Sequence, residues 1–328
     1  MIRLKILINI RKHYNLNHNM NRFFLKIARF IIPHMPRGKS LAIRTALALF
    51  GYKFGDVITL PDGRKFYISI ISPVKKHLFF ANKYEERDTQ IFEKAVSLGD
   101  YFFDIGSSFG WYSTLASRLV GKSGKVFAFD MVPDIIKEFE RNLALNKLDN
   151  NIVMVNKALG DTDGVVDYLY SENTEMGNFK PEMLKDGHKE VRMETLRKGK
   201  VQMISLDKYV EENSIPRVDF IKVDIDGAEV PFLRGARKTL VSKKPIVLIE
   251  VSERGQKAQG HSCLEIFQEL SMAGYEFFSV RFMLRQIEPC EFGKVTKEDV
   301  LCLPTDKLIL LPQLAQDLSR DELPRGEL

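Results

Sequence analysis

Short apolar segments alternate with polar stretches through the centre of the chain, and most of these segments have the length of a β-strand. Five of them predict strands, at residues 101–105, 125–130, 151–159, 218–225 and 245–251. Several are apolar almost throughout, which is typical of strands that are covered on both faces.

Apolar residues recur at helical spacing between these predicted strands. The predicted helices are residues 112–120, 134–145, 228–240 and 263–272. This alternation predicts an α/β fold with a doubly wound, mostly parallel sheet and right-handed crossovers.

The flanking segments have other patterns. Residues 1–55 read as basic helices with an interruption at 33–38, and residues 56–70 alternate around Pro61-Asp62-Gly63, which predicts a β-hairpin. Residues 171–200 are polar, and a loop of this length is typical of a lid or a substrate-binding loop. The expected parts are a helical N-terminal extension (1–55), a hairpin lead-in (56–84), the main domain (85–312) and a polar tail (313–328).

The composition is that of an ordinary globular protein, with 45% apolar and 28% charged residues. The formal net charge is +6, and the first thirty residues hold no acid. Their basic residues are Arg3, Lys5, Arg11, Lys12, Arg22, Lys26 and Arg29. Residues 23–32 are too few to cross a membrane, so we expect a capping helix or a helix that rests on anionic lipid. No nucleic-acid recognition motif accompanies the charge, so nucleic acid is not an expected partner.

The cysteines give a weaker indication. Cys263, Cys290 and Cys302 have no C-x-x-C spacing, and no histidine pairs with them at ligand spacing. We therefore expect reduced thiols, no zinc site and a cytoplasmic protein, either free or peripheral at the inner face of the membrane. No metal ligand is assigned, and a divalent ion at Asp224, Asp226 and Glu250 stays open. The oligomeric state stays open.

The turn after the first predicted strand, Gly106-Ser107-Ser108-Phe109-Gly110, fits two patterns. As G-x-S-x-G it is the nucleophile elbow of a serine hydrolase with Ser108 as nucleophile, but such an elbow normally follows several strands and an oxyanion loop. As a glycine turn it opens a nucleotide-binding βα unit. Gly106 then gives the tight turn, and Gly110 lets the next helix approach the strand.

Two acids near this turn indicate which nucleotide it would bind. Asp130 ends the next predicted strand, where a carboxylate can accept the hydroxyls of a ribose. Asp104 lies directly before the turn, where it would repel a pyrophosphate but would attract the amino group and sulfonium of S-adenosylmethionine. The sequence therefore favours S-adenosylmethionine over NAD. Ser107, Met131 and Asp161 complete the predicted cofactor site, with Asp161 either near the adenine amino group or only opening a turn.

Together these segments resemble the FkbM family of S-adenosylmethionine-dependent methyltransferases. "FFDIGSSFGWYS" resembles its D-x-G-A-N-x-G-x-Y-S turn, and "VDFIKVDIDGAEVPFLRGA" resembles its D-F-I-K-I-D-V-E-G-x-E segment. The chain departs from the family at Ser107-Ser108, where Ala-Asn is usual, and at Asp130 and Asp226, where Glu is usual. The resemblance implies a class I, Rossmann-like methyltransferase with a seven-stranded sheet. It also implies O-methylation of a sugar in a polysaccharide, glycolipid or natural product.

A hydroxyl acceptor needs a base to take its proton. Lys222, Asp224 and Asp226 alternate in "KVDIDGAE", so on a strand they would share one face. We expect Asp224 to position the acceptor or take its proton, with Asp226 beside it and Lys222 keeping it ionised. Glu229, in the first turn of the next helix, is a further catalytic candidate, although a Glu at that position also complements the helix dipole.

Other interpretations stay open. Glu250, at the end of the last predicted strand, and the histidines His188 and His261 are alternative bases. Two other classes of protein also fit the sequence. One is the serine hydrolase, and the other is a non-catalytic protein of the same fold that uses its basic N-terminus to bind a membrane or a partner.

Overall fold

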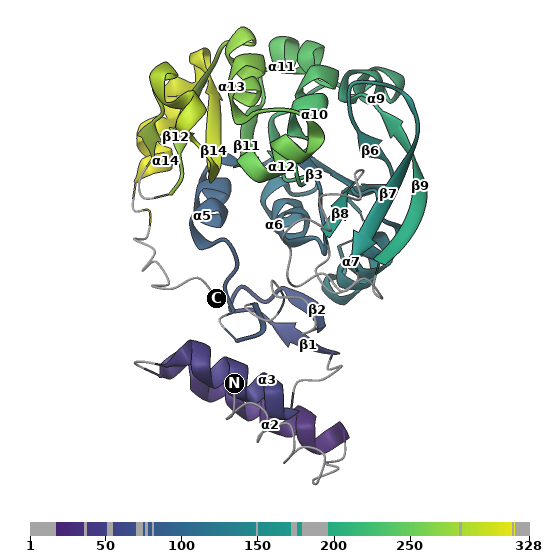
Figure 1. The fold of residues 1–328 in the computed structure, drawn as a ribbon, viewed down its shortest axis with the longest axis vertical. Helices are drawn as coiled ribbons and strands as arrows, with labels where there is room; N and C mark the ends of the chain where they lie inside the picture. Colours follow the sequence, from purple (N-terminus) through teal and green to yellow (C-terminus); the bar gives the residue numbers. More distant parts are fainter. Residues whose placement is uncertain are drawn as a thin grey trace. The chain divides into compact units, whose positions relative to one another are not determined.

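The structure is a computed structural model that describes residues 18–35, 38–50, 55–69, 75, 78–80, 82–148, 150–171, 176–178, 196–281, 284–316 and 318. The described residues up to Tyr84 form one compact unit, and those from Glu85 onward form another. Figure 1 shows the elements of both units.

The first unit contains two longer helices and a hairpin. Its elements are α2 (His18–Ile31), η1 (Ile32–His34), α3 (Lys39–Phe50), β1 (Gly55–Thr59) and β2 (Lys65–Ser69). The two strands pair antiparallel, and Gly63 in their turn has a φ of +82°, which favours glycine. The predicted hairpin is therefore confirmed. Within the described ranges, no helix combines the length and the apolar character needed to span a membrane.

The second unit is built on a large sheet. In spatial order its strands are β13 (Arg285–Gln286), β12 (Tyr275–Ser279), β14 (Lys297–Pro304), β11 (Ile246–Ser252), β10 (Phe220–Val223), β3 (Tyr101–Ile105), β4 (Lys125–Phe129) and β5 (Ile152–Val155). The strands from β11 to β5 are parallel, and β14 runs antiparallel to both of its neighbours. This confirms the predicted α/β class with a mostly parallel sheet.

Helices cover both faces of this sheet. One face carries α5 (Glu86–Ala95), α6 (Trp111–Val120) and α7 (Pro133–Asn146), and the other carries α9 (Leu206–Glu212), α10 (Glu229–Gly235), α11 (Arg237–Lys243) and α13 (Cys263–Met272). The ring of Phe92 on α5 lies 4.8 Å from that of Phe102 and 5.1 Å from that of Phe220. On the opposite face, Phe129 meets Tyr209 of α9 at 4.9 Å. Side chains alternate between the two faces along each strand, so the sheet contributes to an apolar layer on both sides.

The remaining elements complete the second unit. They are α12 (Glu253–Gln259), η3 (Pro289–Lys294), η4 (Thr305–Leu310) and α14 (Leu311–Ala315), together with a smaller sheet of β6 (Ala158–Leu159), β9 (Leu196–Ile204), β7 (Gly164–Ser171) and β8 (Met176–Asn178). β7 and β9 form a long antiparallel ribbon beside α7 (Figure 1). Tyr168 and Tyr170 of β7 pack in one cluster with Ile135 of α7.

Two predicted elements are each divided in the structure. The strand predicted over 151–159 ends at Val155, because Lys157 N donates to Val155 O at 3.0 Å and the chain turns into the smaller sheet. The helix predicted over 228–240 begins at Glu229, is interrupted at Ala236 and continues as α11 to Lys243.

The prediction of a loop over residues 171–200 was also partly wrong. Residues 176–178 and 196–200 are strands of the smaller sheet, since β9 pairs along β7. Residues 172–175 and 179–195 lie outside the described residues, as do His188 and the first seventeen residues.

Close packing at Gly235 gives a test of the fold. A Cβ at this position would lie 1.9 Å from Gly160 O, so Gly235→Ala should overpack the contact between α10 and the turn after β6. We expect a loss of about 1–3 kcal/mol in the free energy of unfolding, measured by denaturant titration. Gly293→Ala is the matched control, because a Cβ there meets no atom within 4 Å, and it should change stability by less than about 1 kcal/mol. Equal losses in both variants would contradict this account.

Candidate active site

The turn after β3 holds the ends of three strands together. The backbone N–H groups of Gly106 and Ser107 both donate to Phe129 O at the end of β4, at 3.0 and 2.9 Å. On its other side, Gly106 has a φ of +85°, and a Cβ there would lie 1.9 Å from Asp224 O. Only glycine fits this position without displacing backbone. The turn therefore joins the β4 end to the acidic segment that follows β10.

The next residues lead the chain into α6. Ser108 has a left-handed φ of +48°, and its N–H donates to Asp130 Oδ2 at 3.2 Å. Gly110 has a φ of +90°, and a Cβ there would lie 2.3 Å from the ring of Phe139 on α7. Gly110 therefore admits the ring of Phe139 on α7, whereas its expected role in letting α6 approach the strand stays a prediction.

Asp130 is a buried acceptor at the carboxyl end of β4. Its Oδ1 accepts from Val132 N at 2.9 Å, and its Oδ2 accepts from Ser108 N. The backbone of Met131 also donates to this carboxylate. A carboxylate has about four acceptor positions, so about one stays open for a ribose hydroxyl. Burial raises the pKa of Asp130 to about 6. Met131, the following residue, is half-buried against the cluster around Val132.

Asp104 is buried one strand away, on β3. It is 2% exposed and accepts a hydrogen bond from Ser113 Oγ at 2.6 Å. Burial raises its pKa to about 6, while Ser113 and the nearby Lys222 oppose that shift. A buried carboxylate beside the turn suits the cationic end of S-adenosylmethionine.

A further atom of the turn fits a bound ligand. Among the described residues, Ser107 Oγ is buried and has no hydrogen-bond partner, and such atoms normally find one. Ser107, Asp104 and Asp130 are therefore the residues that could hold the cofactor. Asp161 is exposed and follows β6 of the smaller sheet. Asn156, which the sequence did not indicate, follows β5 and donates to Asp130 O at 2.9 Å, so it is nearer to the predicted ribose site.

Lys222 is a buried cation in the middle of β10. It is 2% exposed, and its Nζ lies 3.4 Å from Asp224 Oδ2 and 3.7 Å from Asp299 Oδ1. Burial alone would lower its pKa, but the surrounding carboxylates, first Asp224 and Asp299, raise it well above the usual value. Lys222 is also the register partner of Asp104, and its Nζ lies 5.3 Å from the ring centre of Tyr112. The expected pairing of Lys222 with Asp224 is present.

The strand ends sooner than the sequence predicted. β10 stops at Val223, and Asp226 has a left-handed φ of +50°, so strand alternation does not bring Asp226 onto the face of Lys222 and Asp224. Burial, then the charges of Asp224 and Glu229, raise the pKa of Asp226 to about 8.

Glu229 holds the turn between β10 and α10. It is fully buried, and its Oε1 accepts from Ile225 N and Gly227 N, both at 3.2 Å. Its Oε2 accepts from Gln256 Nε2. Because both carboxylate oxygens are bonded to neighbouring segments, we do not include Glu229 among the residues proposed to contact the acceptor.

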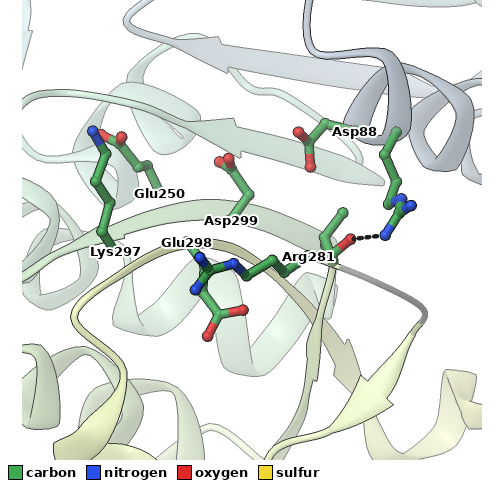
Figure 2. Close-up of a pocket in the computed structure, with 8 residues that line it drawn as sticks. Asp88, Glu250, Arg281, Lys297, Glu298 and Asp299 are labelled. Atoms are coloured by element: carbon green, nitrogen blue, oxygen red, sulfur yellow. Dashed lines mark hydrogen bonds between the residues drawn. The ribbon is translucent and has the colours of Figure 1, made fainter. Parts of the chain in front are cut away.

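A row of carboxylates continues from Asp224 across the sheet. Glu250 on β11 and Asp299 on β14 are register partners, and Lys222 joins Asp299 to Asp224. The charge of Asp224, then burial, raises the pKa of Glu250 to about 9, and burial raises that of Asp299 to about 7. Both residues line a pocket of about 270 Å³, which Asp88 of α5 also lines (Figure 2). The sequence patterns indicated neither Asp88 nor Asp299.

The described residues contain no group of three or more His, Cys, Asp or Glu side chains arranged to hold a metal ion. His261, an alternative base, contacts Glu265 one helical turn away, with Nδ1 3.1 Å from Oε2. It is part of the N-terminal region of α13.

Comparison with known proteins defines the class of enzyme. Residues 104–277 match the model of the methyltransferase FkbM domain, and the chain belongs to this family. It is therefore an S-adenosylmethionine-dependent methyltransferase, which confirms the predicted class and cofactor. The serine-hydrolase hypothesis for Ser108 and the non-catalytic alternative are set aside.

Individual relatives are distant. The chain is 24% identical over 152 residues to the hexuronic acid methyltransferase AglP of Haloferax volcanii, a match that covers 46% of this chain and 56% of AglP. The methyltransferase FkbM of Methylobacillus flagellatus is 13% identical, with 84% of this chain and 58% of that chain covered and a TM-score of 0.41. An O-methyltransferase of Thermotoga maritima is 15% identical, with 76% and 77% covered and a TM-score of 0.39.

Titration of the two buried acids gives a prediction for cofactor binding. As the pH falls through about 6, the carboxylates of Asp104 and Asp130 gain protons and lose the charges that attract the sulfonium and bind the ribose. We expect the affinity for S-adenosylmethionine, measured by calorimetry, to fall about tenfold or more below this pH.

Two comparisons sharpen this measurement. S-adenosylhomocysteine lacks the sulfonium charge and should lose less affinity, and Asp104→Asn should bind S-adenosylmethionine weakly even above this pH. An affinity that does not change with pH would contradict the assigned roles of both acids.

Proposed function

We propose that this enzyme transfers the methyl group of S-adenosylmethionine to a hydroxyl of a sugar, in a glycan or a glycolipid. The observation that carries the proposal is the row of carboxylates around Lys222, formed by Asp224, Glu250 and Asp299. This row begins directly beside residues 106–110, the turn that would hold the cofactor (the cofactor turn). Hydroxyl acceptors need such groups, because their proton must leave for a base. The match to a hexuronic acid methyltransferase over about half of that protein's length supports a sugar acceptor.

On the cofactor side, three residues would hold S-adenosylmethionine. Asp104 would face its cationic end, Asp130 its ribose hydroxyls, and Ser107 Oγ would find a partner there. When bound, the cofactor supplies a methyl group on a positively charged sulfur, which keeps the C–S electron pair as the acceptor oxygen takes the methyl group. The protein's part is to hold the two reactants in line.

On the acceptor side, Asp224 is the residue proposed to position the hydroxyl and take its proton. It is half-buried at the carboxyl end of β10, where ligands bind in open α/β sheets. The ammonium group of Lys222 lies 3.4 Å away and pairs with the Asp224 carboxylate. Asp226, on the same segment, is proposed to contact the acceptor from the following turn.

The direct test uses the full chain, trideuteromethyl-labelled S-adenosylmethionine and a panel of oligosaccharides, with mass spectrometry to locate the label. We expect label on sugar oxygen. Asp224→Asn should lower the transfer rate by about 10²–10⁴, while the affinity for S-adenosylmethionine stays near that of the wild type. Asp134→Asn, at an exposed ion pair on α7, is the control and should keep full activity. Label on nitrogen or carbon, or full activity of Asp224→Asn, would refute the proposal.

We also propose that α2 rests on an anionic membrane surface, on its cytoplasmic side. The helix exposes several large apolar side chains, namely Met20, Phe23, Phe24, Ile27, Phe30 and Ile31. Lys26, between them in sequence, pairs with Asp56 at 3.0 Å and is still 59% exposed. A basic helix with an exposed apolar face is typical of proteins that bind at a membrane interface.

Vesicle sedimentation tests this second proposal. The full chain should bind vesicles that contain phosphatidylserine more strongly than vesicles of phosphatidylcholine alone, and salt should weaken this binding. Replacing both Phe23 and Phe30 by serine should abolish it, whereas Ile309→Ser, at an even more exposed apolar position in the second unit, should not. Binding that survives the double substitution would show that α2 is not the contact.

A further inference from the structure

The pocket beside Lys222 is separate from the turn that would hold the cofactor. Its lining comes from α5, β11, β14 and the segment that directly follows β12 (Figure 2). Its polar side chains include Asp88, Glu250, Arg281, Lys297, Glu298 and Asp299. A volume of about 270 Å³ is close to the lower end of small-ligand pockets, which span about 300–1,000 Å³. The space therefore suits one compact polar group.

The carboxylate of Asp88 indicates that this pocket binds a ligand. Its Oδ1 is fully buried and, among the described residues, has no hydrogen-bond partner. Buried polar atoms without a partner are rare, because each costs about 1–3 kcal/mol. The carboxylates of Asp88 and Asp299 face each other in Figure 2. A group bound between them could supply the hydrogen bond that Asp88 Oδ1 lacks.

The charges of the lining indicate the chemistry of that group. Carboxylates and cations are interspersed, since Arg281 and Lys297 line the same pocket as Glu250, Glu298 and Asp299 (Figure 2). A phosphate would meet the carboxylates and an amine the cations, whereas a sugar hydroxyl both donates and accepts. Burial, then the charges of Asp299 and Glu85, raise the pKa of Asp88 well above its usual value. Protonated acids in the pocket would add donors.

We propose that this pocket binds a sugar ring of the acceptor, with hydroxyls held between Asp88 and Asp299. This inference rests on the proposed function. Lys222 contacts Asp299 with its Nζ at 3.7 Å and Asp224 at 3.4 Å, so a ring in the pocket lies one side chain away from the proposed base. Asp88 and Asp299 are then positioning residues, because they determine which hydroxyl of the sugar ring reaches Asp224.

The test separates sugar binding from methyl transfer. Methyl glycosides of glucose, mannose, rhamnose and glucuronic acid are titrated onto the full chain saturated with S-adenosylhomocysteine, and saturation-transfer NMR reports their binding. The wild type should bind at least one of them. Asp88→Asn and Asp299→Asn should each weaken that binding about tenfold or more, because each replaces a carboxyl oxygen that would bond a sugar hydroxyl with an amide nitrogen. Glu250→Gln is a third variant, in case one of these fails to fold.

The matched control is Asp100→Asn. Burial raises the pKa of Asp100 too. However, Asp100 directly precedes β3, so it lies at the end of that strand away from the cofactor turn. All variants should keep the wild-type affinity for S-adenosylhomocysteine, which also shows that they are folded.

The possible outcomes distinguish failure of the pocket proposal from failure of the proposed sugar acceptor. Loss of glycoside binding in the pocket variants, with Asp100→Asn unchanged, supports the proposal. Unchanged glycoside binding in folded pocket variants overturns the pocket while leaving sugar methylation standing. A wild type that binds none of the glycosides overturns the pocket as a sugar site, and the labelling experiment then decides separately whether a sugar is methylated at all.

Discussion

Charge compensation around the buried Lys222 is the constraint on which the candidate site depends. A buried ammonium group is costly unless carboxylates surround it, and carboxylates at this density repel each other unless a cation lies among them. Lys222 has Asp224 on one side and Asp299 on the other. Neither the buried ammonium group nor the cluster of carboxylates would be stable here without the other. The strand order β14, β11, β10 brings them together, because Lys222, Glu250 and Asp299 come from separate strands.

The second requirement is close contact between backbones. Gly106 lies against Asp224 O, so the cofactor turn and the proposed base belong to one packed unit. A similar contact lies behind it, where a Cβ on Gly227 would be 2.3 Å from Gly255 O. The acidic segment after β10 is thus held between two glycine contacts. Its position is fixed by packing, and its charge is left available for chemistry.

Sequence patterns located the parts of this site that are local. Asp104 and Asp130 end parallel strands and flank a glycine turn, and Lys222 and Asp224 are separated by one residue, so short segments were enough to indicate them. Asp88 and Asp299 carry no such signal. Asp88 lies on a helix before the first strand of the main sheet, and Asp299 joins the site through its register with Glu250, which depends on a pairing distant in sequence. The smaller sheet escaped prediction because β9 is rich in polar residues and reads as loop.

The position of β14 has a consequence for how the enzyme is made. β14 lies between β11 and β12 in the sheet but follows both in the chain. During synthesis, β11 therefore has an open edge until Lys297–Pro304 has left the ribosome, and an open edge is where strands of other chains can add. Asp299 arrives with the same strand. The nascent protein thus acquires the Asp299 counter-charge and closes the open edge of β11 in one event.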